Sequence, residues 1–200
     1  MTTETAPLHP TEAAILAGVH PDVIQRVRNL RLMAFDVDGV LTDGRLWYGP
    51  QGETVKGFHA LDGHGLRLLK ESGLYVVLMT GRQSLIVDRR AAELGIQHVQ
   101  QGVRDKAAAL LQLGQELGLE PAQMGFMGDD LIDLPTMQRA GFAASVPNAP
   151  TYISQAAHWV ADKAGGSGAA RDCCDLILAA QGKLRTFFTP QSVLMAGAIQ

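Results

Sequence analysis

The chain has 200 residues, of which 46% are hydrophobic and 18% are charged, and its formal net charge at pH 7 is −3. This length suits one globular domain with a sizeable core. The charge balance offers no positive excess for a nucleic-acid backbone or an anionic membrane, so we expect neither partner. The sequence shows no signal-peptide pattern and no apolar run of membrane-spanning length, which predicts a soluble, cytoplasmic protein.

We predict three parts: an N-terminal extension at residues 1–30, one domain at residues 31–180 and a C-terminal tail at residues 181–200. The extension contains two short stretches of helical pattern, at residues 11–17 and 21–30. We expect both helices to cover an edge of the sheet that the following residues form.

The apolar run Leu32–Phe35 is followed directly by Asp36 and Asp38. Four consecutive apolar residues predict a short buried strand. Ligands of open α/β sheets bind beyond the carboxyl ends of the strands, so both carboxylates stand where chemistry usually takes place. Asp38 by itself also has the simpler interpretation of a turn residue before Gly39. An EF-hand loop is excluded because Val40 stands where an oxygen ligand is needed.

Residues 45–58 are predicted to form a β-hairpin, because two β-prone runs flank a Gly-Pro-Gln-Gly turn. The hairpin carries five large apolar side chains, Leu46, Trp47, Tyr48, Val55 and Phe58. An isolated hairpin is marginally stable in water, and this one would leave apolar surface exposed. We therefore infer that it packs on a neighbouring subunit.

Helices and short apolar strands alternate along the rest of the domain, which predicts an α/β fold with a parallel sheet and helices on both faces. The predicted strands are residues 75–79, 96–99, 124–127, 142–146 and 158–161. The predicted helices are residues 62–72, 83–94, 105–117, 152–157 and 169–180, with another around Pro135. Residues 165–168 are predicted to be a flexible loop.

Cys173 and Cys174 are adjacent, so they have the spacing of neither a disulfide framework nor a metal site. We predict a reduced pair on a helix, buried or half-buried. The C-terminal tail contains an apolar patch at residues 193–196, which we expect to dock on another surface, such as a second subunit.

Polar residues recur where the other strands end. Thr80-Gly81-Arg82 follows one strand, Lys106 opens a helix, and Asp129, Asp130 and Asp133 follow another strand. All would meet at one rim of the sheet. Thr80 taken alone is better explained as a helix cap than as a ligand.

Two of these features indicate a bound cation and a nearby anion. A lysine in the first turn of a helix opposes the helix dipole by roughly 0.3 to 1 kcal/mol, so Lys106 indicates an anionic neighbour. Acidic residues crowded at a strand end repel one another unless a cation lies between them. Mg²⁺ prefers oxygen ligands and needs only two or three from the protein, so it suits this set.

The chain resembles the haloacid dehalogenase (HAD) superfamily of phosphohydrolases. The resemblance rests on four motifs: Asp36-x-Asp38-Gly39-x-Leu41-Thr42-Asp43, Thr80, Lys106 and Gly128-Asp129-Asp130-x-x-Asp133. Within the superfamily the chain is similar to the family of 3-deoxy-D-manno-octulosonate 8-phosphate (KDO 8-phosphate) phosphatases. That similarity covers residues 30–183 and includes the hairpin in place of a cap domain. Ala170 and Asp172 depart from its pattern, in which a larger apolar residue and Glu are expected.

The resemblance implies a Rossmann-like HAD fold and a catalytic mechanism. Asp36 would attack phosphorus to form an aspartyl-phosphate. Asp38 would act as general acid and then as general base. Mg²⁺ would be held by Asp36, Asp129 and the backbone carbonyl of Asp38, and Lys106 would neutralise the phosphate together with the metal.

The resemblance also implies the supporting residues. Thr80 and the backbone amide of Gly81 would hold phosphoryl oxygens, while Asp130 and Asp133 would orient Lys106 and metal-bound water. The residues implied in substrate binding are His59, Ala60, Leu61, Asp62, Gly63, Arg67, Gly81, Arg82 and Arg90. For the arginines the alternative is a solvated surface position, and for residues 59–63 it is a turn capped by Asp62.

The implied activity is Mg²⁺-dependent hydrolysis of KDO 8-phosphate in lipopolysaccharide precursor synthesis. The implied assembly is a homotetramer whose hairpins and tails cover neighbouring sites. A phosphatase for another acidic sugar, such as a nonulosonate 9-phosphate, would keep the same catalytic residues. A phosphotransferase or mutase would need a larger cap against water, and a non-enzymatic scaffold would not need both Asp36 and Asp38.

Overall fold

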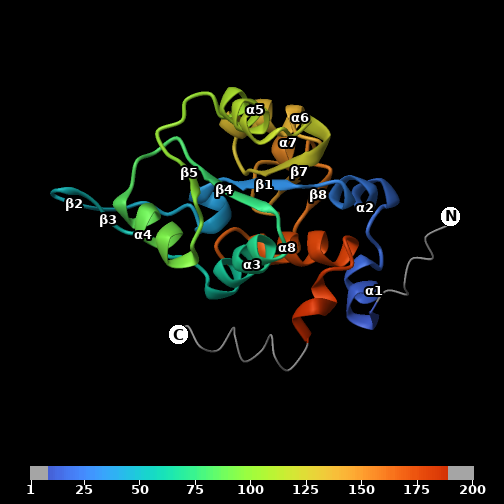
Figure 1. Ribbon diagram of the computed structural model, residues 1–200. Coiled ribbons are helices and arrows are strands. Elements are labelled where there is room, and N and C mark those ends of the chain that lie inside the picture. The colour runs from blue at the N-terminus through green and yellow to red at the C-terminus, as the bar shows by residue number, and fades with distance from the viewer. Residues whose placement is uncertain (1–8, 189–200) are drawn as a thin grey trace.

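The computed structural model describes residues 9–188, which form a six-stranded parallel sheet between layers of helices (Figure 1). The strands, in spatial order, are β5 (His98–Gln100), β4 (Tyr75–Met79), β1 (Leu32–Phe35), β6 (Met124–Met127), β7 (Phe142–Ser145) and β8 (Trp159–Val160). The first strand in sequence, β1, lies in the interior of the sheet and pairs with β4 and β6. The predicted α/β fold class is confirmed.

The two faces of the sheet are covered by different helices (Figure 1). One layer holds α3 (Ala60–Glu71), α4 (Leu85–Leu94) and α8 (Ala169–Ala180), and the other holds α5 (Lys106–Leu117), α6 (Leu134–Arg139) and α7 (Thr151–Ser154). Side chains along β1 alternate between the layers: Met33 and Phe35 join the first core, whereas Leu32 and Ala34 join the second. Both faces of β1 are therefore buried, which explains its unbroken apolar sequence.

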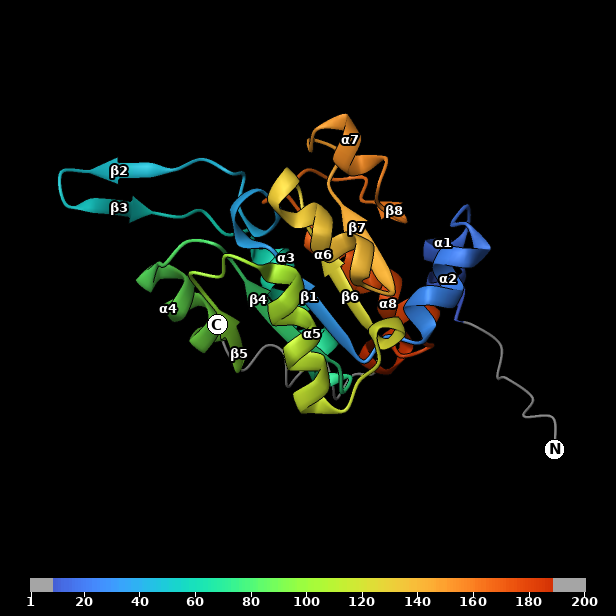
Figure 2. The same cartoon turned by 90° about the horizontal axis from the view of Figure 1, so that it is seen from above.

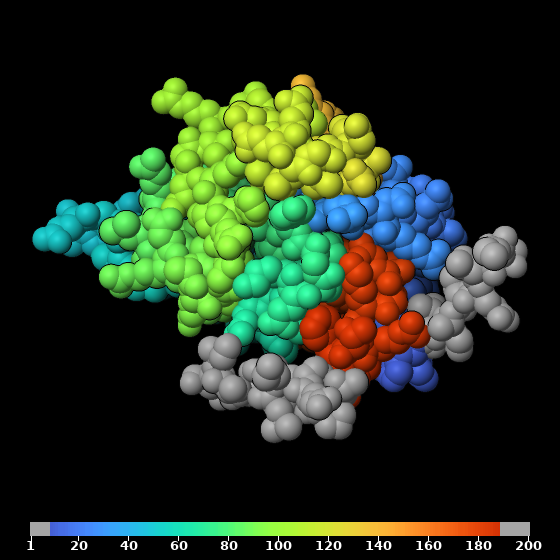
Figure 3. All heavy atoms as spheres, in the orientation of Figure 1, coloured from blue at the N-terminus to red at the C-terminus, as the bar shows by residue number. Residues whose placement is uncertain are grey.

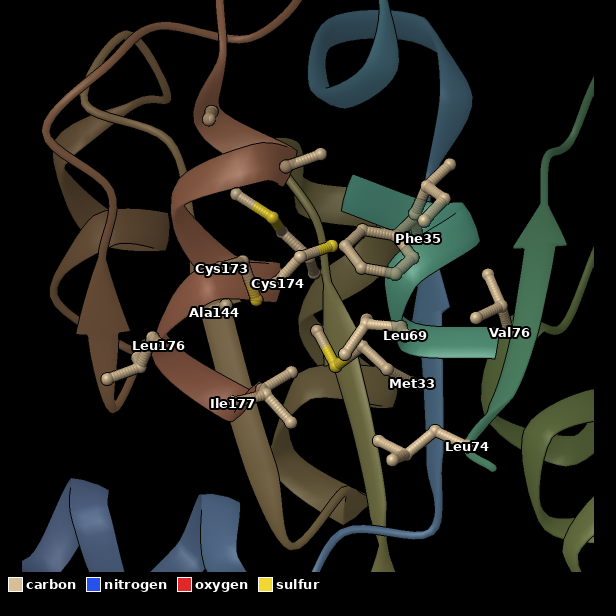
Figure 4. Packing of buried hydrophobic residues seen from close by; sticks show 14 of the residues in the cluster. Met33, Phe35, Leu69, Leu74, Val76, Ala144, Cys173, Cys174, Leu176 and Ile177 are labelled. Atoms are coloured by element: carbon tan, nitrogen blue, oxygen red, sulfur yellow. The ribbon is translucent and has the colours of Figure 1, made fainter. Parts of the chain in front are cut away.

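Cys173 and Cys174 lie on α8 and are buried with free thiols, as predicted. Figure 4 shows them in the core together with Met33, Phe35 and Leu69. Burial raises the pKa of both thiols, so they remain protonated and pack as small apolar side chains.

The N-terminal extension contributes two helices, α1 (Pro10–Leu16) and α2 (Pro21–Arg28). Their main contacts are with α8, whereas we expected an edge of the sheet. The physical reason is the apolar outer face of α8, which Leu16, Val23 and Val27 cover. Residues 1–8 lie outside the described part of the chain.

The predicted hairpin is present as β2 (Trp47–Gly49) and β3 (Gly52–Val55). Figure 2 shows it extending away from the sheet, and in Figure 3 its residues (cyan) project beyond the rest of that face. Leu46, Trp47, Tyr48 and Val55 are all exposed. The hairpin thus presents apolar side chains that nothing in residues 9–188 covers.

The loop at residues 165–168 is packed, although the sequence predicted a flexible loop. The amide of Gly166 donates to the Val40 carbonyl at 2.9 Å, and the amide of Gly165 donates to Asn148 Oδ1 at 3.0 Å. A Cβ atom on Gly165 would overlap the Gly39 carbonyl. The glycines therefore let this loop press directly against the turn that follows β1.

The remaining short helical elements are a π-helical turn at Val37–Leu41 and 3-10 turns at Pro121–Gln123, Leu131–Asp133 and Leu184–Phe188. The apolar patch predicted at residues 193–196 lies outside the described residues. Within residues 9–188 no helix combines the length and the apolar character that crossing a membrane requires.

Candidate active site

Four side chains from separate elements meet at the carboxyl end of the central strands. Asp36 directly follows β1, Thr80 follows β4, Asp129 comes two residues after β6, and Lys106 is the first residue of α5. Because the strands are parallel, their carboxyl ends share one edge of the sheet, which brings these residues together. The convergence that the sequence predicted is present in the fold.

A sharp turn after β1 places Asp36 and Asp38. The Asp36 amide donates to the Met127 carbonyl at 2.9 Å, which fixes the start of the turn against β6. Gly39 has a φ of 102°, in the region that favours glycine, and a Cβ atom there would overlap the Asp129 carboxylate. Gly39 therefore allows the β1 turn and the β6 loop to approach each other closely.

Three carboxylates, those of Asp36, Asp129 and Asp133, offer oxygens that lie within 4.8 Å of one another. Lys106 Nζ lies 2.7 Å from Asp36 Oδ1 and 2.6 Å from Asp133 Oδ1. One buried ammonium group thus contacts two of the three carboxylates, those of Asp36 and Asp133. Asp129 Oδ1 is buried and has no hydrogen-bond partner within residues 9–188.

Burial raises the pKa values of two of these carboxyl groups. Burial raises the pKa of Asp36 to about 6, with Asp133 adding to the effect and Lys106 opposing it. Burial also raises the pKa of Asp129 to about 7, reinforced by the charges of Asp36, Asp133 and Asp130. A divalent cation between Asp36 and Asp129 would remove the repulsion that both shifts express.

Asp133 is fully buried and organises the cluster. Its Oδ1 accepts from Lys106, and its Oδ2 accepts from the amides of Asp129 at 3.1 Å and Asp130 at 3.3 Å. This geometry fits the predicted role in orienting Lys106. The Asp130 side chain instead accepts from the Leu131 amide at 2.7 Å and caps the turn at Leu131–Asp133, so it does not contact Lys106.

Thr80 and Arg82 lie at the end of β4. Thr80 is buried, and its Oγ1 accepts from the Arg82 amide at 3.2 Å. The N-cap of α4 is Ser84, so Thr80 is not the helix cap that was its alternative interpretation. Arg82 Nε lies 3.8 Å from Asp38 Oδ2, and its guanidinium also contacts the Tyr48 hydroxyl and ring.

The predicted substrate residues at the start of α3 separate into two groups. Ala60 and Leu61 are exposed, and His59 Nδ1 is buried without a hydrogen-bond partner in the described chain. The Asp62 carboxylate instead accepts from the amides of Gly168 at 3.3 Å and Arg171 at 2.8 Å. Asp62 thus caps the start of α8, which disagrees with a direct substrate contact because both oxygens point at that helix.

Arg90 lies on α4 against the same end of α3. Its guanidinium packs on Gly63, where a Cβ atom would overlap it, and lies 5.9 Å from the centre of the Phe58 ring. Phe58, Ala60 and Arg90 border a hollow of about 520 Å³. Arg67 is half-buried one turn further along α3. Of the predicted arginines, Arg82 is the one that approaches Asp38.

Lys56, which follows β3, is a further residue of the site that was not predicted from the sequence. Its side chain is only 1% exposed, and its Nζ contacts Asp38 Oδ1 and lies 2.9 Å from Glu53 Oε1. The one signal in the sequence was that this lysine stands among β-prone residues close to the predicted site. The spacing of the hairpin did not reveal that this lysine points inward.

Comparisons with known proteins agree with this geometry. A haloacid dehalogenase-like hydrolase model matches residues 99–171. The 3-deoxy-D-manno-octulosonate 8-phosphate phosphatase of Yersinia pestis is 45% identical over 166 residues, which are 83% of this chain and 89% of that protein. The phosphatase of the same name from Escherichia coli K12 is 43% identical over 86% of this chain and 92% of its own length.

The chain belongs to the KDO 8-phosphate phosphatase family. A family structure from Moraxella catarrhalis, in complex with magnesium, phosphate and KDO, has a TM-score of 0.81 and is 43% identical, covering 84% of this chain and 97% of that one. Membership confirms the resemblance that the motifs indicated. It also confirms the HAD fold, because a solved structure of a phosphatase of this family matches this chain over most of its length.

The residues present fit a magnesium ion, the metal in the Moraxella catarrhalis structure. Asp36 and Asp129 supply carboxylate oxygens, the unpartnered Oδ1 of Asp129 is a ready ligand atom, and no competing lysine or arginine contacts Asp129 among the described residues. Hard oxygen donors at this density are typical of Mg²⁺ sites that retain several waters.

The raised pKa values of Asp36 and Asp129 predict how the stabilisation of the fold by Mg²⁺ depends on pH. In the folded protein the pKa values of Asp36 and Asp129, about 6 and about 7, exceed the ordinary value of 3.8. Without a cation the folded state keeps protons that the unfolded chain has released, so its stability falls as pH rises from about 4 to about 7. Bound Mg²⁺ replaces these protons, so its effect on the melting temperature should be larger at about pH 8 than at about pH 5.

Calorimetric melting with Mg²⁺ and with EDTA at both pH values would measure this difference. Asp129→Asn should abolish most of the Mg²⁺ effect, whereas Asp22→Asn, at an exposed ion pair on α2, should leave it intact. An Mg²⁺ effect of equal size at both pH values would contradict the prediction.

Proposed function

We propose that the protein is a Mg²⁺-dependent phosphomonoesterase that converts KDO 8-phosphate to KDO and phosphate, for lipopolysaccharide precursor synthesis. The observation that carries the proposal is the buried cluster of Asp36, Lys106, Asp129 and Asp133, in a chain that matches KDO 8-phosphate phosphatases over most of its length. Support for the substrate comes from the related Moraxella catarrhalis enzyme, whose structure holds magnesium, phosphate and KDO.

In the first step an Asp36 carboxylate oxygen attacks phosphorus and the bond from phosphorus to the sugar oxygen breaks. The products are an aspartyl-phosphate and free KDO, whose leaving oxygen takes a proton from Asp38. In the second step Asp38 takes a proton from water, which attacks phosphorus and releases phosphate from Asp36. Asp38 stands two residues from Asp36. The leaving oxygen and then the attacking water occupy the same position relative to phosphorus, so Asp38 serves both.

Charge neutralisation allows a carboxylate to approach a phosphate dianion. Mg²⁺, when bound by Asp36, Asp129 and the Asp38 carbonyl, would supply electrostatic stabilisation of the transferring group. Lys106, held between Asp36 and Asp133, would supply a fixed positive charge on the other side. Thr80 and the Gly81 amide would bind phosphoryl oxygens.

The sugar-acid end of the substrate requires a cationic or hydrogen-bonding surface beside the cluster. Arg82 is the arginine closest to Asp38, and Arg90 borders the hollow next to Ala60, so we assign both to the substrate. We also assign the exposed start of α3 to this surface. Arg67 stays a weaker candidate because nothing in the described contacts links it to the cluster.

We propose that the protein assembles as a homotetramer. The exposed Leu46, Trp47, Tyr48 and Val55 on the hairpin support an intersubunit contact, since apolar groups of this size are usually covered. In this arrangement a neighbouring hairpin and tail would help close a site that has no cap domain of its own.

The activity is tested by phosphate release from KDO 8-phosphate, a nonulosonate 9-phosphate and simple sugar phosphates, each with Mg²⁺ and with EDTA. We expect strong preference for KDO 8-phosphate and loss of activity in EDTA. Preference for the nonulosonate ester would leave the proposed mechanism in place and show that the proposed substrate is wrong. No release from any ester by the Mg²⁺-bound protein would favour a transferase or scaffold.

Asp36→Asn should lower turnover of KDO 8-phosphate by roughly 1000-fold or more, because the amide is a poor nucleophile. Gel filtration of the variant should show the wild-type elution volume, since Asp36 contributes to the site and not to the hairpin. Loss of assembly together with activity would instead indicate that Asp36 has a structural role.

Trp47→Ala should weaken assembly by about 2 kcal/mol, the loss typical of a large aromatic anchor at an interface. Sedimentation across a dilution series measures this shift, and Mg²⁺ binding should be unchanged. Tyr152→Ala is the matched control, because Tyr152 is exposed to a similar degree, 55% against 53% for Trp47, but lies on α7. An unchanged dissociation constant for Trp47→Ala would count against the intersubunit hairpin.

A further inference from the structure

Lys56 is a buried cation that the mechanism above does not use. It follows β3 at the base of the hairpin, and its side chain is only 1% exposed. A buried ammonium group is costly unless carboxylates and hydrogen bonds compensate for its lost hydration. Lys56 meets this requirement with two carboxylates, those of Asp38 and Glu53. The lysine therefore links the hairpin to the catalytic turn after β1.

The two oxygens of Asp38 have different surroundings. Oδ1 accepts from Lys56 Nζ, whereas Oδ2 has no hydrogen-bond partner within residues 9–188. A second cation, Arg82, lies beside Oδ2, with its Nε 3.8 Å away. A hydrogen bond to one oxygen fixes the rotation of the carboxylate plane about the bond from Cβ to Cγ. Oδ2 is thereby left in a defined position for another group.

Lys56 is itself held by a chain of contacts. Glu53 Oε1 lies 2.9 Å from Lys56 Nζ, and Glu53 Oε2 accepts from Ser84 Oγ. The Ser84 amide donates to Gln101 Oε1 at 2.8 Å, so the chain ends on the rigid framework beside β5. Glu53 and Ser84 thus anchor β3 to the N-terminus of α4 and restrict where Lys56 can place its ammonium group.

We propose that Lys56 is a positioning residue for Asp38, holding Oδ1 so that Oδ2 faces the oxygen of the leaving alcohol. The inference rests on the proposed function, because it assigns Asp38 as the proton donor. In the step concerned, the bond from Asp36 to phosphorus forms, the bond from phosphorus to the alcohol oxygen breaks, and the proton passes from Asp38 Oδ2 to that oxygen. Lys56 gains and loses no proton.

This role predicts a dependence on the leaving group. An alkoxide such as that of KDO needs the proton as it leaves, whereas 4-nitrophenolate is stable enough to leave without one. In Lys56→Met, which keeps a chain of similar length without charge, single-turnover release of KDO should fall by about 30-fold or more, and release of 4-nitrophenolate by only about threefold. Single turnover with enzyme in excess reports this first chemical step alone.

Two further variants separate positioning from a structural role. In an Asp38→Asn background Lys56→Met should cause almost no additional loss on KDO 8-phosphate, because the group that it positions is already gone. Glu53→Gln should give a smaller loss with the same dependence on the leaving group. Lys163→Met is the matched control: Lys163 also pairs with a carboxylate, Asp172, but is exposed and belongs to another part of the molecule.

Equal losses on both substrates would overturn the proposal and assign Lys56 to phosphate binding or to hairpin stability. No loss on either substrate would also overturn it. If Lys56→Met does not assemble, Glu53→Gln decides the question. Its loss of KDO release relative to the wild type is then compared with its loss of 4-nitrophenolate release. If the wild-type protein hydrolyses another alkyl phosphate but not KDO 8-phosphate, the proposed substrate fails, and that ester replaces it in the same comparison.

Discussion

The ion pair of Lys106 with Asp36 and Asp133 is the interaction on which the site depends. Each of the three side chains is nearly inaccessible to water, so none could remain charged without the others. Such a triad contributes little net stability, because the desolvation cost of the charges offsets their attraction. It does fix geometry: Lys106 and Asp133 together hold the Asp36 carboxylate in one orientation. The remaining negative charge, concentrated on Asp129, is what makes the site demand a divalent cation.

Backbone proximity rather than side-chain length brings these groups together. The turn after β1 contacts the loop after β6 at Gly39, and the 165–168 loop presses on the same turn through Gly165. A methyl group at either glycine would push the loops apart and widen the spacing of the carboxylates. The two packed glycines and the parallel pairing of β1 with β6 thus set the separation between Asp36 and Asp129. Tight packing in this fold is a condition for metal binding as well as for stability.

The sequence was sufficient for the parts of the fold and site that repeat a local pattern. Alternating helices and strands gave the parallel sheet, and polar residues at strand ends gave Asp36, Lys106 and Asp129. It was insufficient where contacts join distant segments. Asp62 caps a helix that begins more than a hundred residues later, and α1 and α2 pack on α8 from the other end of the chain. Nothing local in residues 59–63 distinguishes a cap for a remote helix from a substrate contact.

Lys56 was missed for a related reason, and its position shows how the hairpin serves two purposes. Successive residues of an extended strand face opposite sides, so the exposed Val55 is followed by the buried Lys56. The outward side chains offer a surface to another subunit, while the inward lysine holds Asp38. Any contact that shifts the exposed face of the hairpin must also move Glu53 and Lys56, because these residues tie β3 and the residue after it to Ser84 and Asp38. If the proposed assembly and mechanism hold, subunit contact and proton transfer are connected through one short strand.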